Sequence, residues 1–187
     1  MTNIIRGKEI FLKPVERCDI EQLREWRNSE DVSSHMLSKA IISQEQQEQW
    51  YKAICKDPSV LHWVIMSKEG VKLGVASLTK IGLEPKSAEP GLYIGDKKYR
   101  NSFFGMEAYY YLLDYGFRQL QLEKISGTVL FSNETALKMN ASFGFSMEYM
   151  EKKLVEIEGI ETVVCKLFLN KADFYLSKMA TFFSRRK

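Results

Sequence analysis

The sequence is poor in the residues that metal sites, disulfide frameworks and membrane spans require. It has three cysteines, without a CxxC pair, and two histidines without a partner at metal-ligand spacing. These absences argue against disulfides and against a zinc site, and reduced thiols suit a cytoplasmic protein. No apolar run reaches about 18 residues and the N-terminus has no apolar signal-peptide core, so neither a membrane span nor secretion is expected.

A strong excess of one charge sign is also missing. The chain carries 27 Lys and Arg against 24 Asp and Glu, and the last three residues alone supply three positive charges. A basic face that could neutralise nucleic-acid phosphates is therefore not expected, which argues against nucleic-acid and membrane partners. The four prolines stand singly and no repeat or low-complexity linker divides the sequence, so we expect one domain over residues 1–187.

Hydrophobic periodicity predicts an alternation of strands and helices. Strands are expected at 10–14, 60–66, 73–81, 88–94, 124–131, 146–157 and 161–169. Asp19 is expected to cap a first helix, Ser43 with Gln46 a second through a capping box, and Asn133 a later one. An apolar helix is expected at about 104–120 and a C-terminal helix at about 171–184. This order predicts an α/β (α+β mixed) fold, with one mixed sheet and helices on both faces.

The segment Tyr99–Ala108 runs from a basic loop directly into the apolar helix. The first amides of a helix lack internal partners and the macrodipole is positive there, so a helix start is an anion site. Lys97, Lys98 and Arg100 precede this one. A glycine before a helix is more often ordinary turn chemistry, so the surrounding sequence must decide what binds.

Four local patterns occur in order along the chain. They are Trp26-Arg27-Asn28, Glu89-x-Gly91-x-Tyr93-Ile94-Gly95, Arg100 to Ala108, and Asn133-x-x-Ala136 followed by Gly144-Phe145. Together they resemble the GNAT N-acetyltransferase superfamily over residues 10–169. One branch of the superfamily looks most similar, the one that acetylates UDP-4-amino-4,6-dideoxy-N-acetyl-beta-L-altrosamine on the way to pseudaminic acid. The segments that carry this narrower resemblance are Trp26-Arg27-Asn28, Ile42 with Gln44-Glu45-Gln46, Gly127 to Leu130, and Met139-Asn140. Ribosomal-protein alanine N-acetyltransferases share much of this pattern.

The resemblance implies acetyl-CoA as cofactor. It also implies a mostly antiparallel central sheet in which the fourth and fifth strands run parallel and splay apart, with pantetheine in the gap and the diphosphate on the loop. The cofactor-binding residues it implies are Leu92, Tyr93, Ile94, Arg100, Asn101, Ser102, Phe103, Phe104, Gly105, Met106 and Asn133. Phe103 stands where relatives carry a glycine, so either the loop differs locally or this position is ordinary helix. Asn133 is equally explained as a helix cap.

The catalytic residues implied by the resemblance are Glu89 and Asn140. Glu89 corresponds to an acidic residue that receives the amine proton, although a cross-strand ion pair explains it equally well. Asn140 stands where relatives carry the tyrosine that protonates the departing thiolate. Because an amide has no titratable proton, it offers only a hydrogen bond to sulfur. Water or Ser142 would then supply the proton.

The first two helices and their connecting loop form the expected acceptor wall. Arg27, Asn28, His35 and Met36 are the candidates to bind the substrate, while a surface arginine, a solvated histidine and a core methionine are the plain alternatives. We therefore predict an amino-sugar N-acetyltransferase acting on a nucleotide-linked small-molecule amine, possible as a homodimer. A ribosomal-protein-type N-terminal acetyltransferase is the second hypothesis, and a non-enzymatic acyl-CoA-binding sensor module is the third.

Overall fold

The centre of the computed structural model, which describes residues 4–100, 102–149 and 162–186, is a mixed β-sheet. Its strands are β1 (Ile5–Arg6), β2 (Ile10–Pro14), β3 (Leu61–Ser67), β4 (Lys72–Thr79), β5 (Ser87–Ile94), β6 (Lys124–Leu130), β7 (Ser146–Tyr149) and β8 (Val164–Asn170). They are ordered β1-β2-β3-β4-β5-β6-β8-β7, and β5 and β6 alone run parallel. The predicted mixed sheet with a parallel fourth and fifth expected strand is confirmed.

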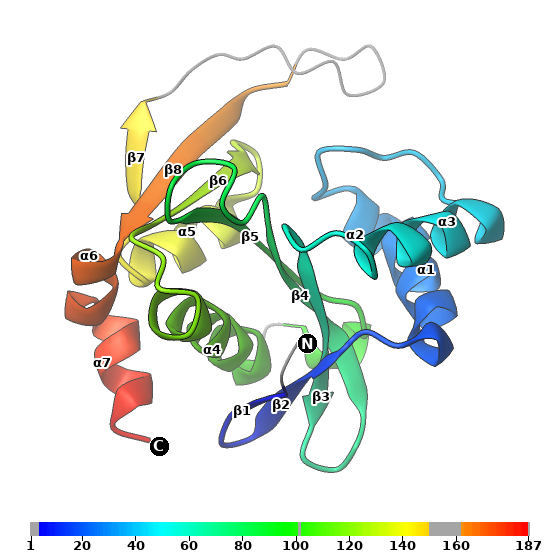
Figure 1. The fold of residues 1–187 in the computed structure, drawn as a ribbon, viewed down its shortest axis with the longest axis horizontal. Coiled ribbons are helices and arrows are strands. Elements are labelled where there is room, and N and C mark those ends of the chain that lie inside the picture. Colours follow the sequence, from blue (N-terminus) through cyan, green and yellow to red (C-terminus); the bar gives the residue numbers. More distant parts are fainter. Residues whose placement is uncertain (1–3, 101, 150–161, 187) are drawn as a thin grey trace.

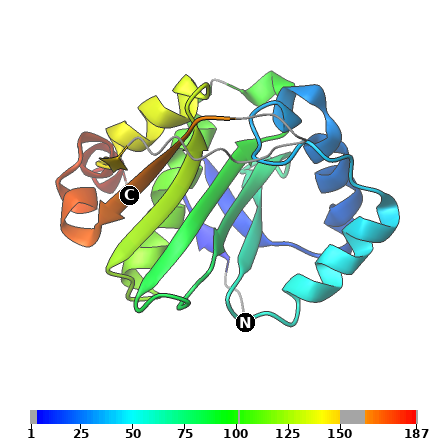
Figure 2. The same cartoon turned by 90° about the horizontal axis from the view of Figure 1, so that it is seen from above.

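Helices cover both faces of this sheet (Figures 1 and 2). They are α1 (Ile20–Asn28), α2 (Glu30–Ser33), α3 (Gln44–Ile54), α4 (Phe103–Arg118), α5 (Glu134–Ser142), α6 (Lys171–Leu176) and α7 (Lys178–Ser184). α1 and α3 lie on one face, and α4 with α5 beside it lies on the other. None of the helices in the described ranges combines the length and apolar character needed to cross a bilayer.

Two apolar layers hold the helices to the sheet. The larger one lies around α4, where Leu112, Leu113 and Phe117 are fully buried, in keeping with a helix that is apolar nearly all round. The smaller one joins α1 and α3 to the opposite face through Leu23 and Val64, with Trp26 and Trp50 packed against them. The thinner packing under α1 and α3 leaves space on that face, and the candidate site lies there.

The elements differ from the expected ones at a few places. β1 and α2 escaped prediction because two and four residues are too short for a periodic signal. The C-terminal helix is interrupted at Ser177, whose extended backbone ends α6 and whose hydroxyl caps α7 by accepting a bond from Ala180 N at 3.1 Å. The second hairpin arm, expected at 161–169, is β8 from Val164 to Asn170, whereas the first arm, expected at 146–157, is a strand as far as Tyr149, and 150–161 lie outside the described residues.

Asp19 precedes α1 but does not cap it. Its carboxylate instead accepts a bond from Glu16 N at 3.0 Å and pairs with Lys13 of β2 at 2.9 Å and Lys72 of β4 at 2.7 Å. The side chain is fully buried, and it therefore ties the beginning of α1 to two strands. The caps predicted at Ser43 and Asn133 are confirmed, with Gln46 N and Ala136 N as donors.

A candidate acetyl-transfer cavity between separating strands

The parallel strands β5 and β6 are paired over a very short distance. Only Ser87 with Lys124 and Ala88 with Ile125 are in register, although both strands continue for several residues. Beyond these pairs, the side of β5 that faces β6 has no strand partner among the described residues, so its backbone groups are open to hydrogen bonding. The splay predicted for these two strands is confirmed.

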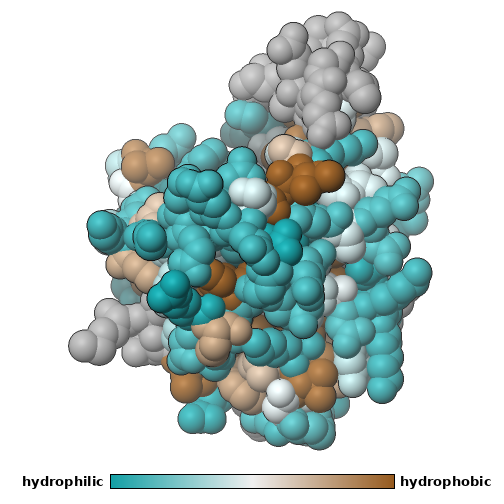
Figure 3. Space-filling view, turned by 90° about the vertical axis from the view of Figure 1, so that its right-hand side faces the viewer, coloured by the Kyte–Doolittle hydropathy of each residue, from teal (hydrophilic) through white to brown (hydrophobic). Residues whose placement is uncertain are grey.

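A cavity of about 760 Å³ extends from this gap to the wall formed by α1, α3 and the loop between α2 and α3. This is within the usual size range of small-ligand sites. Its lining includes Leu92, Tyr93 and Asn133 from the predicted donor set and Arg27, His35 and Met36 from the predicted acceptor set. Figure 3 shows the outer side of the wall, largely hydrophilic with separate apolar patches.

Among the described residues that line the cavity, Arg27 is the one cationic side chain, and none is Asp or Glu. Its Nη2 donates to the carbonyl oxygen of Ser38, while Nη1 is buried without a hydrogen-bond partner in the described ranges. Burial lowers the pKa of Arg27, yet a guanidinium stays charged in proteins. The cavity therefore contains a partly unsatisfied positive charge that no carboxylate of its lining balances.

The Trp26-Arg27-Asn28 triplet and the pattern that ends at Gly95 meet in space. A Cβ placed on Gly95, at the end of β5, would lie 2.1 Å from Trp26 Cδ2 on α1. Only a residue without a side chain permits this approach. The contact sets the position of the C-terminal end of α1, and therefore of Arg27, relative to the strand that borders the gap.

We expect the substitution Gly95→Ala to destabilise the fold by about 1 to 3 kcal/mol, because the added methyl must displace a packed indole. Gly127→Ala is the matched control, since its Cβ would meet only Pro90 Cδ at an ordinary 3.7 Å. Urea unfolding followed by circular dichroism measures both. Equal midpoints for the two variants would contradict the proposed contact.

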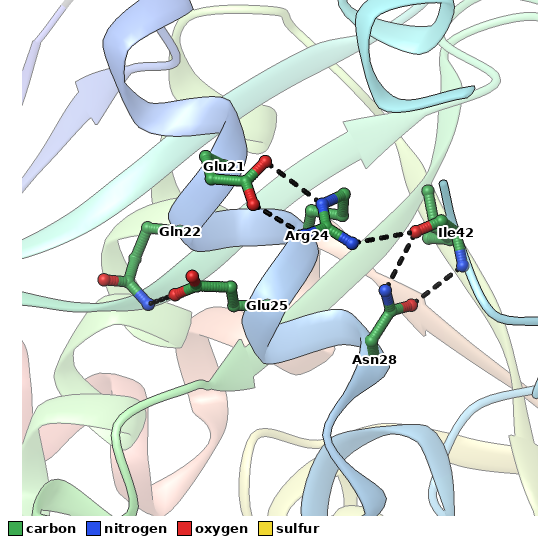
Figure 4. Close-up of polar contacts among 6 residues, drawn as sticks. All are labelled: Glu21, Gln22, Arg24, Glu25, Asn28 and Ile42. Carbon is green, nitrogen blue, oxygen red and sulfur yellow. Dashed lines mark hydrogen bonds and ion pairs between the residues drawn. The ribbon is translucent and has the colours of Figure 1, made fainter. Parts of the chain in front are cut away.

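Asn28, predicted to bind the substrate, is not among the residues that line the cavity, and its side chain is engaged by the neighbouring loop. Its Nδ2 donates to Ile42 O at 2.9 Å and its Oδ1 accepts from Ile42 N at 2.9 Å. Arg24 Nη1 also donates to Ile42 O, at 3.3 Å, so two side chains of α1 converge on one peptide (Figure 4). Asn28 thus anchors the loop that carries His35 and Met36.

The N-terminus of α4 fits the predicted anion site in part. Ser102 precedes the helix, but its hydroxyl donates to Tyr99 O and caps no amide of the first turn, which also contains no acidic residue. Phe103 is the first helical residue and has no positive φ, so the strain considered for it is absent. It packs against Phe182 and Phe183 of α7.

The remaining residues predicted to bind the diphosphate differ in whether other protein groups already engage them. Arg100 was expected to meet the diphosphate, but its guanidinium donates to Ile94 O and Gly95 O at 3.2 Å and pairs with Asp31 at 3.0 Å. Asn101 lies outside the described residues. Phe104, Gly105 and Met106 form the first turn of α4, and neither they nor Ile94 line the cavity.

The two predicted catalytic residues are placed differently. Glu89 lies on β5 next to cavity-lining Pro90 but does not line the cavity, and its carboxylate pairs with Lys80 at 2.8 Å. Its role as base stays a prediction. Asn140 lines the cavity and is buried, with Oδ1 accepting from Tyr109 OH and Nδ2 donating to Ala136 O, both at 2.8 Å. Nδ2 retains a second hydrogen.

Sequence reasoning missed Tyr109 and His62, which also line the cavity. Tyr109 was assigned to packing because its helix is apolar nearly all round, and burial raises its pKa strongly, so the hydroxyl stays protonated. His62 was assigned to packing because a strand pattern does not reveal which face is hollow. Its ring contacts the Trp50 ring edge-on, at 5.1 Å between centroids.

Comparisons with known proteins agree with this arrangement. A family model described as "Acetyltransferase (GNAT) domain" matches residues 9–146. The probable N-acetyltransferase YjcK of Bacillus subtilis (strain 168) is 24% identical over 168 residues, which cover 84% of this chain and 91% of that protein.

Among solved structures, the spermidine N-acetyltransferase of Vibrio cholerae in complex with CoA and spermine superimposes with a TM-score of 0.82 at 22% identity, covering 89% of this chain and 98% of that one. A GNAT-family acetyltransferase of Bacillus anthracis gives a TM-score of 0.79 at 18% identity, covering 91% and 99%. The family match spans most of the chain, and the fold agrees over the part that these structures cover. The protein belongs to the GNAT acetyltransferase family.

Proposed function

We propose that the protein transfers the acetyl group of acetyl-CoA to the amine of a small acceptor that carries an anionic group, and that a UDP-linked 4-amino-4,6-dideoxy sugar is this acceptor. The observation that supports the acceptor class is the Arg27 guanidinium. Its buried Nη1 has no hydrogen-bond partner among the described residues, and no carboxylate of the described lining balances its charge. A phosphate that accepts from a guanidinium would satisfy this donor with a charge-assisted bond.

Acetyl-CoA is the acetyl donor of this family and supplies an acetyl group activated as a thioester. The described residues fit it at two places. The α4 amides from Phe103 to Met106 have no side-chain cap and suit a diphosphate, while the open edge of β5 at Leu92 and Tyr93 suits an extended, amide-containing arm. Asn133, although it caps α5, also lines the cavity.

Attack on a thioester requires a neutral amine held close to the carbonyl. The apolar side chains around the gap exclude water, which favours the uncharged amine over the ammonium ion. Asn140 can donate its second Nδ2 hydrogen into the cavity. The wall of α1 and α3 borders the other side, so that the acceptor and the gap share one partly open cavity.

The V. cholerae enzyme is described in complex with spermine, a polycation. A polyamine acceptor is disfavoured here, because a polycation entering a cavity that holds Arg27 and no described carboxylate would lose hydration without gaining an ion pair. An N-terminal acetyltransferase would need a groove open to a peptide. The wall anchored through Asn28 and Ile42 borders the cavity on one side, and the acceptor panel below distinguishes a peptide from a nucleotide sugar.

A panel of acceptors tests this proposal, with release of free CoA as the readout. It should contain UDP-, dTDP- and GDP-linked 4-amino sugars, spermidine, and peptides with free N-terminal alanine or serine. We expect the highest kcat/KM with a UDP-linked sugar and the lowest with spermidine. A preference for spermidine or a peptide would contradict the acceptor class, and acetyl-CoA binding without transfer to any amine would support the sensor hypothesis.

A further inference from the structure

The cavity needs a group that removes the amine proton, and its described lining offers few. Arginine cannot serve, and burial raises the pKa values of Tyr93 and Tyr109 so far that neither phenol yields an effective base. No carboxylate lies among the described residues that line the cavity. Two histidines, His35 and His62, remain.

The two histidines differ in how they are held. His35 lies in the exposed loop after α2, whereas His62 lies within β3 on the floor of the cavity. In the sheet His62 stands opposite Ser77 of β4, and Ser77 stands opposite Gly91 of β5. All three line the cavity and so form one row across its floor, directed at the gap between β5 and β6.

The row keeps a polar path between His62 and the gap. Neighbouring strands are about 4.8 Å apart, so His62 and Gly91 are separated by roughly two such steps. Ser77 lies between them, and its Oγ would be only 2.5 Å from a Cβ on Gly91, which shows that this hydroxyl reaches over the β5 backbone. A serine hydroxyl both donates and accepts, so Ser77 can relay a proton only when its Oγ turns to within hydrogen-bond distance of a ring nitrogen of His62.

We propose that His62 is the general base of the transfer, reached by the amine proton directly or through Ser77. This inference rests on the proposed function. As the amine nitrogen bonds to the acetyl carbon, its N–H bond breaks and the proton joins a ring nitrogen of His62. Overall the C–S bond breaks, a C–N bond forms, and the proton finally resides on the released thiol.

The surroundings of His62 keep the ring in its accepting form. Among the described residues, its ring nitrogens have no hydrogen-bond partner. Trp50 contacts it from α3, Ser77 is its neighbour on β4, and the charged or titratable groups that share the cavity are Arg27, Tyr93, Tyr109 and His35. None of these is an anion at neutral pH, and burial lowers the pKa of His62 to about 4. The imidazole is thus neutral throughout the physiological range. A pKa this low also makes it a weak base, so it acts on the N–H of the cationic adduct that forms as nitrogen bonds to carbon, which is far more acidic than the free amine.

The substitution His62→Gln tests this role, because glutamine keeps a polar side chain but cannot be protonated. We expect kcat with the best acceptor of the panel to fall about 10²-fold, the lower end for a lost general base, with unchanged acetyl-CoA affinity by calorimetry. Glu89→Gln is the rival variant. Unaltered kcat in His62→Gln, or a larger loss in Glu89→Gln, would overturn the proposal.

A measurement that does not need turnover accompanies the kinetics. The chain has only two histidines, so imidazole NMR spectra of the protein without ligands contain two ring systems, which His35→Gln assigns. We expect His62 to titrate near pH 4, and an ordinary value near 6.5 would overturn the buried, neutral ring. If the unaltered protein acetylates no amine, the proposed function fails, and the role of His62 falls with it.

Discussion

Replacing Arg27 by methionine should raise the KM for a nucleotide-linked acceptor by about 10²- to 10³-fold, which corresponds to about 3 to 4 kcal/mol of lost binding. The reason is that methionine fills much of the same space but leaves the anion of the acceptor without its buried partner. The KM for acetyl-CoA should stay unchanged, because the residues proposed to bind the donor lie on β5, α4 and α5.

Two further variants separate a lost anion contact from a disturbed wall. Arg27→Lys retains the charge but has fewer donors for Ser38 O and the acceptor, so an intermediate KM is expected. Arg17→Met removes an exposed cation that pairs with Glu48 outside the cavity, and it should leave both KM values unchanged. Calorimetry with UDP alone gives a direct readout. Equal UDP affinity in Arg27→Met and the unaltered protein would refute the anion contact.

Replacing Asp19 by asparagine should lower the free energy of unfolding by about 2 to 4 kcal/mol. The carboxylate is fully buried, and its loss leaves the ammonium groups of Lys13 and Lys72 without their shared anion. The two lysines keep part of their hydration, which moderates the cost. Glu134→Gln is the matched control, because it breaks an exposed pair with Lys138, and its unfolding midpoint should stay unchanged.

The effect of Asp19 should depend on pH with a definite sign. Burial on its own would raise the pKa of the Asp19 carboxyl, but the hydrogen bonds from Lys72, Lys13 and Glu16 N outweigh it and hold the pKa below its usual value. The unfolded chain then binds the proton more readily, so this stabilisation is present above about pH 4 and is lost as the pH falls further. Urea unfolding at pH 7 and at pH 3 should show the two proteins converging. A pH-independent difference would contradict this assignment.

Local signals in the sequence predicted most elements of the fold. Ser43 and Asn133 each cap a helix by accepting a bond from the amide three residues on, at Gln46 and Ala136. The apolar sequence of α4 by itself predicted that this helix is buried. Such features need no knowledge of distant residues. Where two distant segments meet, the sequence was less informative: Arg100 was predicted to meet a diphosphate, and the sequence did not show that α2, which was not predicted, places Asp31 beside it.

The candidate site, too, was predictable where local patterns define it and not where distant segments meet. The resemblance indicated the gap between two parallel strands, since family patterns follow the backbone of β5. It could not show that Asn28 is engaged by Ile42, or that His62, Ser77 and Gly91 lie in one row, because both depend on cross-strand and loop-to-helix registers. Glu89 and His62 are now competing candidates that one pair of variants distinguishes.

The two-residue pairing of β5 with β6 has a further consequence for the behaviour of the protein in a crowded solution. Where the strands part, each has an edge in the middle of the sheet that no described residue pairs, and exposed edges are usual starting points for self-association. Here the edges face each other across a confined space. A second polypeptide chain would have to enter with its side chains, whereas the slender pantetheine arm of acetyl-CoA needs less width. We therefore expect these interior strand edges to take less part in self-association than edges on the outside of a sheet.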